Sequence, residues 1–149
     1  MIKSLLIAGA LAGAVAAPAM AGGLESHHVN AGVVIDPNGD STSASVGGRY
    51  NVPNIPVSLR GDLTIGDDFG GGVAVTADFG IAENINLYGG GGAAFGSGTP
   101  LNGDNDVVGV ALVGIEAGIA EKVVVFADVN FGLGGETTYI PKVGVGYRF

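Results

Sequence analysis

Apolar and polar residues alternate with a period of two towards the end of the chain. Between Tyr139 and Phe149, aromatic and aliphatic residues fall on one face, while lysine, arginine, glycine and Ile140 fall on the other. Successive side chains of a β-strand point to opposite faces, so this segment is predicted to be a strand with one apolar face. The same alternation recurs upstream, between turn-forming clusters of Gly, Pro, Asn and Asp. The predicted strands are Glu25–Ile35, Ser41–Tyr50, Val57–Ile65, Gly71–Gly80, Asn84–Phe95, Asp106–Gly118, Val123–Gly132 and Thr138–Phe149.

Aromatic residues collect near the ends of the apolar faces. In an antiparallel series of strands, they fall into two groups at opposite ends of the sheet, as in the aromatic girdles of membrane barrels. The group at the end that carries the chain terminus is Tyr50, Phe79, Tyr147 and Phe149; the other group is Phe69, Phe95, Phe131 and Tyr139. The strand over Asp106–Gly118 is apolar on both faces, so its phase stays open.

Charged residues concentrate on the opposite, inward face. Four basic and four acidic positions share it: Arg49, Arg60, Lys142, Arg148, Asp62, Asp78, Glu116 and Asp128. Isolated burial of a charge is costly, so these groups are expected to pair across a narrow lumen. The polar fillers are expected to be His28, Asn30, Thr64, Thr76, Asn86 and Asn130. The alternative is that the same charges line an ion-conducting pore.

The beginning of the chain has the layout of a secretory signal peptide. Lys3 precedes an apolar stretch, and Ala19-Met20-Ala21 forms a small-x-small cleavage site. We therefore predict a signal peptide over 1–21 and a single barrel domain over 22–149. The chain has no cysteine, which excludes a disulfide framework and a lipoprotein anchor.

Composition favours a membrane barrel over an ordinary soluble domain. Only 13% of the residues are charged, 29 are glycine, and no apolar run after residue 21 is long enough to form a spanning helix. The predicted fold class is all-β: an eight-stranded antiparallel up-and-down transmembrane β-barrel that follows a cleaved signal peptide.

This combination resembles the small bacterial outer-membrane barrels, the OmpA transmembrane-domain and OmpX-like group. The resemblance is architectural and covers the whole chain after the signal peptide. It implies residence in the outer membrane of a Gram-negative cell, contact with outer-membrane lipid, and an insertion machinery that reads Tyr147 and Phe149 as the closing signal. It also implies a monomer. The chain departs from the group in the absence of tryptophan and in its short outer loops. These loops are the connections at the end opposite Phe149, namely Asp36–Asp40, Gly66–Gly70, Gly96–Asn105 and Leu133–Thr137.

Candidate chemistry in the sequence is sparse. The only histidines, His27 and His28, are adjacent, so on a strand they face opposite ways and cannot act as a pair. We expect no enzyme activity and no cofactor. Two loops place oxygen ligands at alternate positions, and they lack the later ligands of a calcium loop, so turn formation is the simpler explanation. These weak calcium candidates are Asp36, Asn38, Asp40, Asn102, Asp104 and Asp106.

Acidic residues dominate the outer loops, and the formal net charge of the whole chain is −8. Such a surface disfavours nucleic acid and could take divalent cations beside phosphate-rich lipid. Three functional hypotheses follow. The first is a non-enzymatic outer-membrane barrel with a structural or surface role and a filled, charged lumen. The second is a narrow, cation-preferring porin-like channel, and the third is a soluble secreted β-barrel that binds a small ligand.

Overall fold

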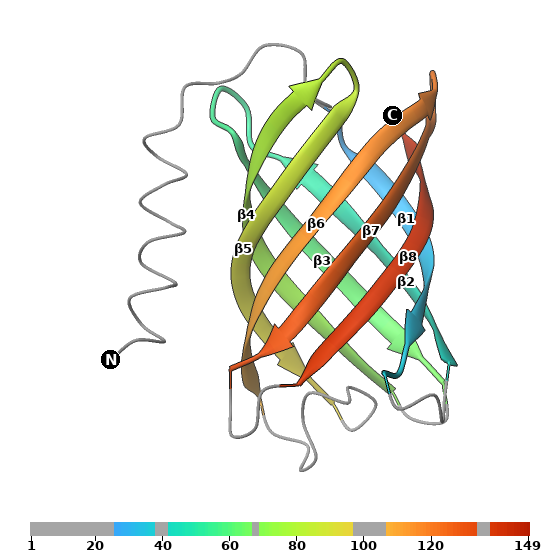
Figure 1. Cartoon of the computed structure of the whole chain (residues 1–149), viewed down its shortest axis with the longest axis vertical. Helices are drawn as coiled ribbons and strands as arrows, with labels where there is room; N and C mark the ends of the chain where they lie inside the picture. The colour runs from blue at the N-terminus through green and yellow to red at the C-terminus, as the bar shows by residue number, and fades with distance from the viewer. Residues whose placement is uncertain (1–25, 38–41, 67–68, 97–106, 134–137) are drawn as a thin grey trace.

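The chain forms a closed β-barrel in which each strand pairs antiparallel with the next and the last strand pairs with the first (Figure 1). This computed structural model describes residues 26–37, 42–66, 69–96, 107–133 and 138–149. The predicted all-β, eight-stranded, up-and-down antiparallel barrel is confirmed. The strands are β1 (His28–Ile35), β2 (Thr42–Asn51), β3 (Val57–Ile65), β4 (Phe69–Ala82), β5 (Ile85–Phe95), β6 (Val108–Ala120), β7 (Val123–Gly132) and β8 (Tyr139–Arg148).

The two ends of the barrel differ. At one end β1 begins, β8 ends, and short turns join β2 to β3, β4 to β5 and β6 to β7; we call this the terminal end. The opposite end, which we call the loop end, carries the remaining connections. Within the described ranges, no helix is long and apolar enough to cross a membrane. The predicted signal peptide lies outside the described residues.

Two hairpins at the terminal end extend further than the sequence pattern predicted. The predicted strands Gly71–Gly80 and Asp106–Gly118 each end at a glycine that begins a Gly-Ile-Ala-Glu segment, but the Ile and Ala residues of both segments belong to β4 and β6. In both hairpins the register shifts at this point, between Gly80 and Ala82 and between Gly118 and Ala120. A bulge adds one residue to a strand without ending it, so each strand continues to a two-residue turn. In the first turn, Asn84 adopts a positive φ of 60°, which asparagine tolerates well.

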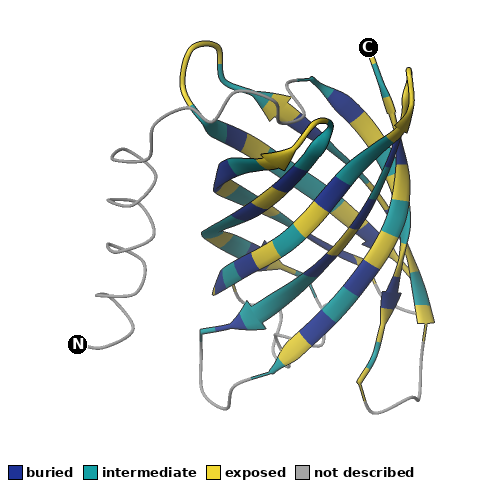
Figure 2. Ribbon diagram, turned by 45° about the horizontal axis from the view of Figure 1, so that its top comes forward, coloured by how far each residue is buried: buried dark blue, intermediate teal, exposed yellow. Residues whose placement is uncertain are grey.

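Burial alternates along much of the barrel wall, as Figure 2 shows by its bands of colour, although β4 has three consecutive buried residues at Thr76, Ala77 and Asp78. Inward positions hold nearly all of the charged groups of the strands together with apolar side chains such as Phe126 and Ile140, whereas outward positions are mainly apolar and exposed. The open phase of β6 is resolved by its pairing with β5, where Glu116 lies opposite the buried Asn86. Val110 and Leu112 therefore face inward, and Val113 and Ile115 face outward. Polarity is thus reversed relative to a soluble protein, with charge inside and hydrocarbon outside.

Candidate functional site: a charged network in the barrel lumen

Four charged side chains form a closed ring of ion pairs in the half of the lumen towards the terminal end. Arg49 and Arg60 lie opposite each other on β2 and β3, where two like charges would repel. Asp78 from β4 and Glu116 from β6 lie between them, and each arginine contacts both acids. The Arg49 distances are 3.2 Å to Asp78 and 3.1 Å to Glu116; the Arg60 distances are 3.0 Å and 3.1 Å. We call these four residues the charge quartet.

Hydroxyl and amide groups satisfy the remaining donors and acceptors of the quartet. Arg49 Nε donates to Ser58 Oγ at 2.9 Å, and that hydroxyl donates in turn to Asp78. Arg60 Nε donates to Thr76 Oγ1 at 3.0 Å, and Asn86 Nδ2 donates to Glu116 Oε1 at 3.2 Å. The Glu116 side chain is 0% exposed and that of Arg49 is 1% exposed. Because two positive and two negative groups balance and are bonded on several sides, the burial cost of each charge is largely offset.

A second group of charges lies nearer the loop end. Lys142 Nζ is 3.5 Å from Asp62 Oδ1 and 3.8 Å from Asp128 Oδ2. Asp128 also accepts a hydrogen bond from the Tyr88 hydroxyl at 3.0 Å and one from Asn130 at 3.4 Å. We call Lys142, Asp62 and Asp128 the lysine cluster. It holds one positive and two negative groups, so this half of the lumen carries a surplus of negative charge.

Tyr88 connects the two groups, although the sequence pattern predicted no role for it. The Arg60 guanidinium carbon lies 3.5 Å from the centre of the Tyr88 ring, close enough for a cation–π contact, while the hydroxyl reaches Asp128. Alternation along β5 places Tyr88 on the inward face together with Asn86, away from the aromatic residues of the apolar face. A further signal is its cross-strand partner Gly114, where an added Cβ would lie 2.4 Å from Tyr88 Cζ. Phe126 faces inward opposite Gly144 in the same way.

Arg148 was expected to belong to the lumen network and lies apart from it. In the part of the chain that the structure describes, its guanidinium donates to the carbonyl oxygens of Glu121 and Ala120 and to Asn84 Oδ1. Arg148 is the last residue of β8, so its side chain reaches the turns of the terminal rim before it reaches any lumen carboxylate. It therefore ties hairpins together at the rim.

A cavity of about 70 Å³ occupies the lumen towards the loop end. Its walls combine the lysine cluster with apolar side chains such as Leu112 and Phe126. A space of this size holds a few water molecules. Towards the terminal end the lumen is filled by Tyr88, Arg60 and the rest of the quartet. Among the described residues, the lumen thus holds a small cavity towards the loop end and a hydrogen-bonded charge network towards the terminal end.

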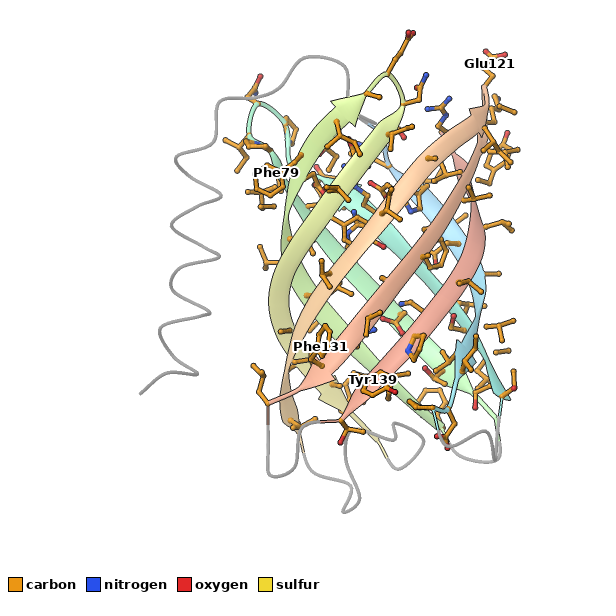
Figure 3. The ribbon with its side chains drawn as sticks, viewed as in Figure 1. Phe79, Glu121, Phe131 and Tyr139 are labelled. Atoms are coloured by element: carbon orange, nitrogen blue, oxygen red, sulfur yellow. The ribbon has the colours of Figure 1, made fainter. Side chains whose placement is uncertain are left out.

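The aromatic residues on the outer face gather towards the strand ends. Phe79 lies near the terminal end, and Phe131 and Tyr139 lie near the loop end, as Figure 3 shows. Tyr50 is exposed near the terminal end of β2, and Phe69 and Phe95 are exposed at the loop ends of β4 and β5. Tyr147 and Phe149, the predicted insertion signal, are both exposed at the terminal end.

His27, the first of the two histidines, is held in place where β1 meets the end of β8. Its ring stacks on Tyr50 with centroids 4.6 Å apart, and its Nδ1 accepts a hydrogen bond from the Asn51 backbone N–H at 3.1 Å. Its carbonyl oxygen accepts one from the Phe149 N–H at 3.2 Å. His28 faces inward instead and is buried next to Arg49 and Arg148 in the ladder. The two rings therefore face opposite ways.

Most of the weak calcium candidates lie outside the described residues. Of the six, the structure describes only Asp36. Among the described residues, no group of three or more histidine, aspartate or glutamate side chains is arranged to hold a metal ion.

Comparison of the sequence with protein-family models and with curated proteins found no match. Comparison of the structure with solved structures found several barrels. A de novo designed transmembrane β-barrel matches with a TM-score of 0.66 and 13% identity, covering 83% of this chain and 95% of the design. The N-terminal β-barrel domain of Pseudomonas aeruginosa OprF matches with a TM-score of 0.63 and 17% identity, covering 83% and 97%.

The outer membrane protein Ail of Yersinia pestis matches with a TM-score of 0.55 and 18% identity, covering 85% of this chain and 100% of Ail. These identities are low, so the likeness concerns the fold. The chain has the architecture of the small eight-stranded outer-membrane barrels, as the sequence resemblance predicted, with no individual member of that group identified.

Proposed function

We propose that this protein is a non-enzymatic outer-membrane β-barrel with a structural or surface role, and that its lumen is closed to ions. The observation that carries the proposal is the reversed polarity of the barrel. Large apolar side chains such as Val73, Val113 and Val145 are more than half exposed on the outer face, while Glu116 and Arg49 are buried inside. An apolar surface of this extent is stable in hydrocarbon and would promote aggregation in water.

The plugged lumen supports a role other than transport. The quartet has no net charge and its groups bond to one another, so an ion entering the lumen would have to break these pairs. An eight-stranded barrel is just wide enough for its own side chains. The surroundings of the two histidines support a non-enzymatic role, since His27 is held by Tyr50 and Asn51, and His28 is buried against the quartet.

A narrow cation-preferring channel is the second candidate function. The observation that favours it is the surplus carboxylate in the lysine cluster, which faces the cavity of about 70 Å³. Conduction would require the Arg60–Tyr88 contact and the quartet to move aside.

The proposed partners are outer-membrane lipid, the insertion machinery that reads Tyr147 and Phe149, and divalent cations at the acidic loops. The protein is proposed to act as a monomer.

Conductance in planar bilayers distinguishes the two candidates. Purified protein that migrates faster unheated than boiled on SDS gels, and is therefore folded, is expected to give no discrete current steps. The same preparation after boiling serves as the control for detergent and contaminants. Stable, reproducible, cation-selective steps from the folded protein alone would establish the channel and overturn the closed lumen.

A further inference from the structure

A shallow groove of about 910 Å³ runs across the outer face of the barrel over β1 to β5. Two rows of cross-strand neighbours form it. The first row is Val29, Gly48, Gly61, Val73 and Ala93, which pair in succession from β1 to β5. The second is Tyr50, Leu59, Val75 and Gly91, which pair from β2 to β5. Most of the residues that line the groove are apolar or glycine, and His27, His28, Arg49 and Arg60 also contribute to its lining. Its floor is lowest where glycine replaces a side chain.

The glycine at the centre of the groove is not required by the packing of the barrel. At Gly61, an added Cβ would lie 3.7 Å from the nearest atom, which is an ordinary van der Waals contact. At inward glycines the same atom would collide, as at Gly92, where it would lie 1.8 Å from the Val73 carbonyl oxygen. Glycine weakens a strand interior, and in strands it often marks a place where a ligand approaches the backbone closely. The recess at Gly61 thus calls for an explanation outside the barrel.

The end of the groove at the terminal rim has a different chemistry. His27, Tyr50 and Phe149 line it there, and the first two rings are stacked. Across the β1–β8 pairing, Val29 lies opposite Tyr147, and Lys122 Nζ is 5.7 Å from the Tyr147 ring. Lys122 is exposed at the rim, while its neighbour Glu121 sits at the tip of the hairpin (Figure 3). Tyr147 and Lys122 do not line the groove, but they lie beside its rim, one strand beyond Val29. An apolar recess with aromatic rings at its rim and an ammonium group nearby matches a lipid tail that leads to a phosphate headgroup.

We propose that this groove binds one anionic phospholipid, with an acyl chain over Gly61 and its phosphate beside Lys122. The inference rests on the proposed membrane location. A second copy of the chain is a poorer occupant, because a two-fold interface would place the recess against itself and leave a void. A flexible acyl chain fills a curved recess without that penalty.

Quenching of a single tryptophan by brominated lipid tests the proposal, since the natural chain has no tryptophan. The reporter is placed in the groove as Leu59→Trp and outside it as Val113→Trp; both positions are exposed on the outer face. Each variant is reconstituted into phosphatidylcholine vesicles that contain a small fraction of phosphatidylglycerol with brominated chains. We expect the groove reporter to be quenched well beyond the bulk fraction of brominated lipid, and the control in proportion to it.

Two further substitutions in the Leu59→Trp background identify the contacts. Gly61→Leu fills the recess and is expected to abolish the excess quenching. Lys122→Gln removes the cation and is expected to lower the apparent affinity for brominated phosphatidylglycerol about fivefold, the contribution of one basic residue near an anionic lipid.

The remaining outcomes overturn the proposal in distinguishable ways. Equal quenching of both reporters, in proportion to bulk composition, would mean that the groove holds only ordinary surrounding lipid. Loss of quenching at Leu59→Trp alone, increasing with protein density, would show that a second copy covers the groove. Absence of quenching at both positions would show that the chain is not in the membrane, and the proposed function would fail with it.

Discussion

Replacing Arg60 with alanine is expected to destabilise the folded barrel by about 3–5 kcal/mol, the usual cost of removing one partner from a buried ion pair. Arg60 contacts both acids of the quartet and stacks on Tyr88, so its loss leaves Asp78 and Glu116 with Arg49 as their only counter-charge in the quartet. The change is measured as the urea concentration at which reconstituted protein loses its fast-migrating band.

Arg148→Ala is the matched control for this substitution. It also removes an arginine, but Arg148 is the last residue of β8 and donates mainly to backbone carbonyls at the exposed rim. Its expected cost is at most about 1 kcal/mol, as for a typical net hydrogen bond. If both variants unfold at the same urea concentration, the quartet has no special part in stability.

A double substitution separates charge balance from the loss of packing. Arg60→Met together with Glu116→Met leaves one arginine and one aspartate, which balance. Each single substitution leaves an uncompensated charge, so the double variant is expected to be more stable than the sum of the single effects predicts. Strict additivity would indicate that the four charges act independently.

A second large loss of folding stability is expected when a single methyl group is added to β5 by the substitution Gly90→Ala. At Gly90, an added Cβ would lie 1.9 Å from the Val75 carbonyl oxygen, so Gly90→Ala must displace the backbone of β4. Overpacking of this kind costs about 1–3 kcal/mol and more where backbone must move. At Gly89, the next residue, the same atom would lie 3.6 Å from the Leu112 carbonyl oxygen.

Gly89→Ala, one residue away, is therefore a control that is expected to leave the stability of the barrel nearly unchanged. Its effect is expected to lie within about 1 kcal/mol and to be stabilising if anything, because alanine loses less backbone entropy on folding than glycine. Folding yield into vesicles and the urea midpoint measure both variants. Equal tolerance of alanine at the two positions would mean that the lumen is wider than described.

The periodicity of two predicted which residues face inward on strands with one polar face, such as those of Arg60 and Asp78, because alternation is a local property of each strand. On β6, which is apolar on both faces, the inward position of Glu116 was settled only by the pairing with β5. The periodicity could not predict the partners of these residues. Arg60 and Glu116 are 56 residues apart in sequence, and their meeting depends on the register of four strands around a closed barrel. The same limit explains Arg148, whose phase was inward but whose height in the barrel places it at the rim.

Strand boundaries followed the pattern where turns contain strong turn-forming residues, as in β3 and β7. They failed at the two Gly-Ile-Ala-Glu segments, because a bulge breaks the alternation without ending the strand. Tyr88 was missed for a different reason. Its role depends on Gly114 on the neighbouring strand, which leaves room for the ring, and that complementarity becomes visible only once the pairing of β5 with β6 is known.

Cysteine labelling is the sharpest test of whether the outer face of this barrel lies in lipid. The chain contains no cysteine, so a single introduced thiol reports its own position. Val113 is 51% exposed at the middle of β6, and a water-soluble maleimide would reach it freely if the barrel were a soluble protein. Glu121 on the terminal rim is also exposed and serves as the accessible reference.

The protein is reconstituted into vesicles that are briefly permeabilised, so that the reagent reaches both surfaces of the membrane. Under these conditions Glu121→Cys is expected to react rapidly. Val113→Cys is expected to stay unlabelled until urea and heat unfold the chain. This result would place the outer face in hydrocarbon. Labelling of Val113→Cys at the same rate as Glu121→Cys in the folded protein would contradict the account and would favour a soluble barrel.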